Sequence, residues 1–297
     1  MRKLAFRTVD VFAESKYAGN QLAVFTSASS VSEIEMQKIA KEMNYSETTF
    51  VLSRQKRDGG YDVRIFTPNE EVPFAGHPTL GTAYVIQQAI VRKAVKSVVL
   101  NLKVGQVPVS LSYKAKTPDL LWMKQIQPTF GKTELPRQSA AQMLSIDENL
   151  IDSRFPIEEV STGLSFIIVP LKSLDAVKRS RIDKAKYFEF IKDKSSKGVM
   201  VFCPEAYAKV NQINARVFID YYGIPEDPAT GSANGCLAAY LVKHSYFGSD
   251  HIDNIRVEQG YEIGRPSLLF LKATMKGELI DVWVGGRVVM IAKGVFV

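Results

Sequence analysis

The order of hydrophobic and polar positions in the first half of the chain predicts several strands, one surface helix and one buried helix. The surface helix is expected over residues 32–43, because Ser32 and Glu35 have the spacing of an N-terminal capping box and the apolar residues after them share one helical face. Residues 74–90 carry almost no charge and predict a buried helix, with Pro78 at its first position. Alternating apolar and polar residues predict strands over 4–12, 21–25, 49–53, 61–66, 97–102, 106–113 and 120–125.

The second half of the chain repeats this plan. Residues 233–242 predict a second charge-free, buried helix. Shorter helices are expected over 140–144, 173–180 and 185–192, and strands over 165–170, 199–203, 214–218, 267–275, 278–284 and 287–297. The last two strands are expected to form a hairpin that turns at Gly285-Gly286. Residues 128–136 combine proline, glycine and mixed charge, which is typical of a connection between domains.

Two segments far apart in the chain resemble each other. The first is Arg-Ile-Phe-Thr-Pro (64–68) with Gly-His-Pro-Thr-Leu-Gly (76–81), and the second is Arg-Val-Phe-Ile-Asp (216–220) with Gly-Ser-Ala-Asn-Gly (231–235). With two copies, the chain is neither a solenoid nor a propeller. We therefore expect two similar half-domains, residues 1–118 and 119–297, and the last strands can return to the first half.

Each copy supplies a strand, a glycine-containing loop and the start of an apolar helix. The glycines Gly76 and Gly231 allow close backbone approach, and a helix start leaves several N–H groups without partners. If two such helix starts meet across a cleft, their partial positive charges can hold a carboxylate and stabilise an enolate-like oxyanion. The alternative is that the glycines serve close packing between the halves.

Few groups able to move protons occur in or near these loops, namely Glu47, Glu70, Glu71, His77, Asp227 and Ser232. Glu47 lies where the first helix meets a strand, and its uncharged neighbours are expected to shield it from water. A shielded carboxylate can deprotonate carbon. The alternative is a capping or solvent-facing glutamate.

His77 directly follows Gly76 and is expected at a helix start, where the helix dipole disfavours a protonated imidazole. Asp227 and Ser232 are its counterparts in the second copy. They offer a carboxylate and a hydroxyl. The structural alternatives are a turn before Pro228 for Asp227 and an N-cap for Ser232.

Composition and charge exclude several classes of function. Of the 297 residues, 46% are hydrophobic and 23% charged, as in soluble globular proteins. The net charge is +7, but acidic residues interrupt the basic ones, which indicates a solvated surface and no nucleic-acid partner. The sequence contains neither a secretory signal nor an apolar run long enough for a membrane, so we expect a cytoplasmic protein.

The motifs of several enzyme classes are missing from the sequence. It has no Gly-x-Ser-x-Gly elbow, no Walker lysine motif and no Gly-x-Gly-x-x-Gly between a strand and a helix. The two cysteines, Cys203 and Cys236, have no partners at metal-ligand spacing, and we expect neither zinc nor a disulfide. Both lie away from the predicted helix starts, which argues against a two-cysteine racemase.

The motifs together resemble the PhzF-like isomerases of phenazine biosynthesis, whose fold is shared with diaminopimelate epimerase. These motifs are Asp-Val-Phe (10–12), Ala-Gly-Asn (18–20), Ser-Glu-Thr (46–48), Arg-Ile-Phe-Thr-Pro (64–68), Val-Pro-Phe-Ala-Gly-His-Pro-Thr-Leu-Gly (72–81) and Glu-Asp-Pro-Ala-Thr-Gly-Ser (226–232). The resemblance implies an α+β fold of two similar half-domains, each a curved, mostly antiparallel sheet wrapped around a central buried helix. It also implies a homodimer without cofactor or metal.

By the same resemblance, Glu47 matches the family's acid/base glutamate, and the residues that shape the site and assist proton delivery are His77, Asp227 and Ser232. A small carboxylate substrate is expected to be bound by Asn20, Gly76, Thr230 and Gly231. The phenazine enzyme catalyses a 1,3-hydrogen shift on dihydro-hydroxyanthranilate. The alternatives are an amino-acid epimerase or racemase, and a retired enzyme that binds a small molecule. One departure from the family is Gln21, which stands where a proline is usual.

Overall fold

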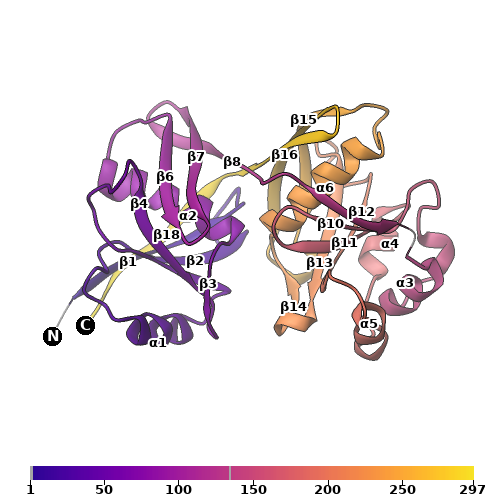
Figure 1. Ribbon diagram of the computed structural model, residues 1–297, viewed down its shortest axis with the longest axis horizontal. Helices are drawn as coiled ribbons and strands as arrows, with labels where there is room; N and C mark the ends of the chain where they lie inside the picture. Colours follow the sequence, from indigo (N-terminus) through magenta and orange to yellow (C-terminus); the bar gives the residue numbers. More distant parts are fainter. Residues whose placement is uncertain (1–2, 134) are drawn as a thin grey trace. The chain divides into compact units, whose positions relative to one another are not determined.

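The computed structural model describes residues 3–133 and 135–297, which form two compact units (Figure 1). Unit 1 contains Met1–Met123 and Gly285–Val297, and unit 2 contains Lys124–Val284. The chain therefore leaves unit 1 after its first 123 residues and returns to it for the last strand. No helix in the described part of the chain is long and apolar enough to cross a membrane.

Unit 1 is built on a mixed sheet with one helix enclosed by its strands. Its helices are α1 (Glu33–Met43), α2 (Gly76–Ile86) and the π-helix η1 (Gln87–Val91) that continues α2. Its strands are β1 (Leu4–Val11), β2 (Asn20–Phe25), β3 (Glu47–Val51), β4 (Tyr61–Phe66), β5 (Glu71–Val72), β6 (Ser97–Leu102), β7 (Gly105–Lys114), β8 (Thr117–Lys124) and β18 (Val288–Phe296).

Unit 2 has the same kind of sheet and more helices. Its helices are α3 (Arg137–Leu144), α4 (Leu174–Arg179), α5 (Lys184–Ile191) and α6 (Gly231–Lys243), with short 3-10 turns at Glu148–Leu150, Asp220–Tyr222 and Tyr261–Ile263. Its strands are β9 (Thr129–Thr133), β10 (Glu158–Ser161), β11 (Ser165–Pro170), β12 (Gly198–Cys203), β13 (Ile213–Ile219), β14 (Ile224–Asp227), β15 (His251–Gln259), β16 (Ser267–Lys276) and β17 (Leu279–Gly286).

The two units share one strand topology. In unit 1, antiparallel pairing joins β18, β1 and β2, then β2 runs parallel to β3, β3 antiparallel to β4, β4 parallel to β6 and β6 antiparallel to β7. Unit 2 repeats this order and these directions with β9, β10, β11, β12, β13, β15 and β16. The short strands β5 and β14 pair with β4 and β13 in the same way. The internal repeat seen in the sequence is therefore a repeat of structure.

The helices α2 and α6 form the centres of their units. Residues 77–86 of α2 and 233–242 of α6 are buried on every side, which is why neither segment shows an amphipathic pattern. In Figure 1, α2 lies among the strands of unit 1, and it contacts β1, β2, β3, β6 and β7. In unit 2, α6 packs against β10, β11, β15 and β16.

The outer faces of both sheets are covered as well. In unit 1, α1 packs on a cluster that includes Phe25, Phe50 and Phe66. In unit 2, α3, α4 and α5 cover an apolar face of β11, β12 and β13. Strands buried on both faces have near-continuous apolar sequences, and Gly198–Cys203, which is wholly buried, is an example.

Each unit also contains the same arginine–glutamate pair. Arg64 on β4 donates to both carboxylate oxygens of Glu71 on β5, at 2.8 and 2.5 Å. Arg216 on β13 donates to both oxygens of Glu226 on β14, at 2.9 and 2.7 Å. Each pair holds the strand that leads into the start of the central helix.

Most predicted elements are confirmed, including the helix capped by Ser32, whose Oγ accepts a hydrogen bond from the backbone N–H of Glu35 at 3.2 Å. The α+β class with two similar sheet-and-helix units is confirmed too. The predicted first helical position of Pro78 is wrong, because α2 begins at Gly76.

Two interpretations of loops are wrong. Residues 128–136 are not a plain connection, since β9 lies within them and pairs with β10. The predicted turn at Gly285-Gly286 is wrong, because both glycines belong to β17. The chain re-enters unit 1 at Gly285, and β18 then pairs with β1. β10, β14 and β15 have no counterpart among the predicted strands.

We expect the two arginine–glutamate pairs to contribute differently to the free energy of unfolding. The Arg216 side chain is 5% exposed, and its second carboxylate, that of Glu262, lies 3.9 Å away. The Arg64 side chain is 23% exposed and has Glu33 as a second partner at only 2.7 Å. Glu226→Gln should lower the free energy of unfolding by about 3 kcal/mol, because it leaves a buried guanidinium short of counter-charge. The matched change Glu71→Gln should cost about 1 kcal/mol or less. Urea denaturation measures both, and equal losses would contradict the difference in burial.

Candidate functional site

In unit 1, the side chains of Glu47 and His77 lie in contact. Glu47 is the first residue of β3 and His77 the second residue of α2. Glu47 Oε2 lies 3.3 Å from His77 Nε2, and the side chains are 17% and 7% exposed, respectively. The chain therefore holds a carboxylate against an imidazole at the start of its buried helix.

His77 is neutral in this environment. Burial lowers the pKa of His77 from 6.5 to about 3, and a hydrogen bond with the backbone of Gln21 opposes this shift. The contact with Glu47 has the distance of an ion pair, but a neutral ring makes it a contact between a carboxyl group and an uncharged imidazole. The neutral ring expected from the sequence is thus supported by burial.

The tautomer of His77 follows from its two neighbours. The bond to the Gln21 backbone favours the protonated ring, so the backbone acts as the acceptor, which must be the carbonyl. Nε2 makes no hydrogen bond of good geometry. We therefore assign the ring proton to Nδ1, which leaves the lone pair of Nε2 directed at Glu47.

The other predicted residues of unit 1 lie at the same end of α2. Asn20 opens β2 and is 1% exposed. Its neighbour Gln21 contacts His77, and Leu22 pairs with Glu47 in the parallel register of β2 and β3. Gly76 is the first residue of α2. Unit 1 therefore brings Asn20, Glu47, Gly76 and His77 together.

Unit 2 gathers its predicted residues along one short connection. Asp227 ends β14, Thr230 is the N-cap residue of α6, and Gly231 and Ser232 open that helix. The Thr230 hydroxyl donates to Asp227 Oδ2 at 2.5 Å. Ser232 is half-buried. The alternative that it forms the N-cap of the helix is wrong, because the N-cap residue is Thr230.

The starts of the two central helices are without side-chain caps. Neither Ala75, before α2, nor Thr230, before α6, bonds a backbone N–H of the first turn through its side chain. By contrast, α1, α4 and α5 are capped by Ser32, Ser173 and Asp183, while α3 follows Pro136 without a cap. Uncapped N–H groups and the helix dipole favour an anion at these two helix starts.

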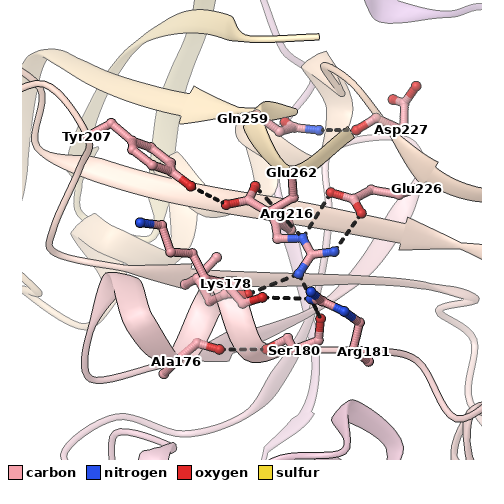
Figure 2. A network of polar contacts seen from close by, with 11 residues as sticks. Ala176, Lys178, Ser180, Arg181, Tyr207, Arg216, Glu226, Asp227, Gln259 and Glu262 are labelled. Atoms are coloured by element: carbon pink, nitrogen blue, oxygen red, sulfur yellow. Dashed lines mark hydrogen bonds and ion pairs between the residues drawn. The ribbon is translucent and has the colours of Figure 1, made fainter. Parts of the chain in front are cut away.

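Sequence reasoning did not identify Gln259 and Asn234, which are fully buried beside Thr230. Gln259 Nε2 donates to the backbone carbonyl of Asp227 at 2.8 Å, as Figure 2 shows. Asn234 Nδ2 donates to Gln259 Oε1 at 2.9 Å. The sequence around Gln259 is polar, so nothing local marked it, and its role depends on contacts with residues far away in the chain.

The two cysteines do not form part of this site. Both are buried, and burial raises the pKa of Cys203 to about 11 and that of Cys236 to about 12. A thiol with such a pKa is a poor source of thiolate at neutral pH. Within residues 3–133 and 135–297, no group of three or more His, Cys, Asp or Glu side chains could hold a metal ion.

Comparisons with known proteins show the family to which this chain is related. A family model described as phenazine biosynthesis-like protein matches residues 9–294. The trans-2,3-dihydro-3-hydroxyanthranilate isomerase of Pseudomonas aeruginosa is 34% identical over 287 residues, which cover 96% of each chain. The crystal structure of a PhzF-family phenazine biosynthesis protein from Bacillus anthracis matches with a TM-score of 0.91 at 27% identity, over 100% of both chains.

A more distant likeness extends only to the fold. A probable proline racemase from Agrobacterium radiobacter K84 matches with a TM-score of 0.65 at 11% identity, over 98% of this chain and 92% of the racemase. The family model, the relative and the close structural match all span nearly the whole chain. The chain therefore belongs to the phenazine biosynthesis-like (PhzF) family of isomerases.

Proposed function

We propose that this protein is a cofactor-independent isomerase that moves a proton between two carbon atoms of a small carboxylate substrate, with Glu47 as the acid/base. The observation that carries the proposal is the contact of Glu47 with a neutral His77 beside the uncapped start of α2. It combines a group able to take a proton with backbone N–H groups able to hold an anion.

The neutral imidazole suits Glu47 to a reversible proton transfer. With its proton on Nδ1, His77 turns a lone pair towards Glu47 and gives the carboxylate no hydrogen bond. Once Glu47 has taken a proton from carbon, the carboxyl group can donate to Nε2. The contact therefore offers an acceptor to a protonated Glu47, and the same carboxyl group can return the proton to a second carbon.

The negative charge that develops on the substrate needs a separate partner. The uncapped N–H groups at Gly76 and His77 carry the positive end of the α2 dipole and would stabilise a carboxylate or an enolate. The start of α6 offers the same donors at Gly231 and Ser232. We assign substrate binding and assistance in proton delivery to Ser232 and Asp227.

The first substrate to test comes from the relatives. The relative that is 34% identical is named for trans-2,3-dihydro-3-hydroxyanthranilate, a carboxylate whose isomerisation requires a proton to change carbon. We propose this compound or a close carboxylate analogue. The raised pKa values of Cys203 and Cys236 argue against a racemase that uses two thiolates, because both thiols stay protonated at neutral pH.

Replacement of Glu47 should abolish proton transfer. With the dihydro-hydroxyanthranilate in deuterium oxide, wild-type protein is expected to form isomer that contains solvent deuterium, as judged by mass spectrometry. Glu47→Gln should lower the rate by at least about 100-fold, since a general acid/base contributes that much or more. The control is Glu70→Gln, which removes a nearby exposed carboxylate and should leave the rate unchanged. Equal incorporation by wild type and Glu47→Gln would remove Glu47 from this role.

His77 should stay neutral in the folded protein at every working pH. Because its pKa is lowered to about 3, its ring resonances should not titrate between pH 5 and 8 in an NMR experiment. Between about pH 3 and 6.5 the unfolded chain binds a proton at His77 that the folded chain does not, so acid lowers stability by about 1.4 kcal/mol per pH unit from this group.

His77→Gln tests the same point through stability. The variant should lose that part of the pH dependence, so its free energy of unfolding should fall less steeply from pH 6.5 downwards than that of the wild type. Identical slopes, or a titration of His77 near pH 6.5, would show that the ring is solvated.

A further inference from the structure

We propose that Gln259 is a positioning residue, which directs the Thr230 hydroxyl at Asp227 and thereby orients the Asp227 carboxylate. This inference deepens the proposed function and rests on it for the role of Asp227. Gln259 is the last residue of β15, and its side chain reaches the connection between β14 and α6 (Figure 2).

The amide of Gln259 uses all of its hydrogen-bonding capacity on this connection. Nε2 donates to the Asp227 carbonyl at 2.8 Å and to Thr230 Oγ1 at 3.1 Å. Oε1 accepts from the Thr230 backbone N–H at 3.3 Å and from Asn234 Nδ2 at 2.9 Å. The side chain is 0% exposed, so water does not compete for these bonds.

These bonds determine the direction of the Thr230 hydroxyl. An amide NH₂ group can only donate, so Thr230 Oγ1 is an acceptor towards Gln259. The hydroxyl proton is then available to Asp227, whose Oδ2 lies 2.5 Å away. Two consecutive hydrogen bonds with defined donors, here called the relay, therefore run from Gln259 through Thr230 to one oxygen of the Asp227 carboxylate.

The backbone beside Gln259 packs closely against the connection between β14 and α6. Gly260 has a φ of +77°, and a Cβ placed there would lie 2.6 Å from the carbonyl oxygen of Pro228 and 2.5 Å from that of Arg265. Ser267 on β16 also donates to the Pro228 carbonyl, at 2.9 Å. The residues after Asp227 are thus held in place by β15 and β16 together.

The internal repeat shows that the fold does not require this network. Arg64 on β4 matches Arg216 on β13, so β4 corresponds to β13 and the strands paired with them, β6 and β15, correspond as well. In the register of these parallel pairs, Leu102 on β6 occupies the position of Gln259 on β15. Glu71 matches Glu226, and the residues after them align without a gap, so that Val72 matches Asp227 and Ala75 matches Thr230.

Unit 1 therefore forms the same connection with three apolar residues, Val72, Ala75 and Leu102. In unit 2 these positions hold Asp227, Thr230 and Gln259. The polar network is present in the one repeat that carries a carboxylate at this position. We infer that it serves the orientation of that carboxylate.

The same comparison supplies variants that should fold. Gln259→Leu, and Gln259→Leu combined with Thr230→Ala, give unit 2 the residues that unit 1 already uses. With the dihydro-hydroxyanthranilate as substrate, we expect kcat to fall by about 10- to 100-fold and KM to change little, because the carboxylate is misdirected while the helix start is retained. A general loss of structure would not produce this separation of kcat from KM.

Matched controls isolate the hydroxyl. Thr230→Val removes the hydroxyl that connects Gln259 to Asp227 and should behave like Gln259→Leu. Gln212→Ala removes another amide of unit 2, which bonds Val210 and Arg256, and should leave kcat unchanged. Wild-type kcat in Gln259→Leu or in Thr230→Val would overturn the proposal.

A second measurement does not depend on turnover. In a crystal structure of Gln259→Leu, the Asp227 carboxylate should have turned away from Thr230 Oγ1. An unmoved carboxylate overturns the positioning role even if activity falls. If the carboxylate moves but the wild type neither turns over nor exchanges the substrate, the positioning role stands and the proposed function is wrong.

Discussion

Each unit depends on the burial of one helix whose enclosed residues include no Asp, Glu, Lys or Arg. Residues 77–86 of α2 and 233–242 of α6 are enclosed by strands, so their packing leaves no polar face that could bind a ligand. At the two starts the first backbone N–H groups have no partner within the helix, and neither start is capped by the side chain of its N-cap residue. Burial of the helix body and binding at the helix start are thus two results of the same apolar sequence.

The repeat explains how one framework can carry two kinds of chemistry. Arg64 with Glu71 and Arg216 with Glu226 fix equivalent strands in both units, and these pairs are the same in the two copies. The residues that follow differ. Unit 1 has apolar residues before the helix and His77 at its second position, while unit 2 has Asp227, Thr230 and Ser232. The part of the repeat that is the same in both units holds the backbone, and the part that differs carries the side chains to which we assign proton transfer.

Local sequence predicted what depends on local physics. Ser32 with Glu35 marked the start of α1, and the lack of charge in 77–86 marked a buried helix. β9 and β15 were missed because polar residues interrupt their apolar pattern, and the burial of Glu258 and Gln259 depends on partners elsewhere in unit 2. Glu47 and His77 could be named from motifs, but their 3.3 Å contact and the neutrality of His77 result from packing between β3 and α2.

A single carboxyl group that removes and returns a proton needs a neighbour that does not hold it in one state. A charged histidine would pair with Glu47 and keep it as a carboxylate, which would make proton uptake from carbon costly. The burial of His77 prevents this, because its pKa of about 3 leaves the ring uncharged beside Glu47. The same apolar packing that encloses α2 therefore also sets the charge of the imidazole. The acid/base role that we propose for Glu47 therefore depends on how the helix is buried.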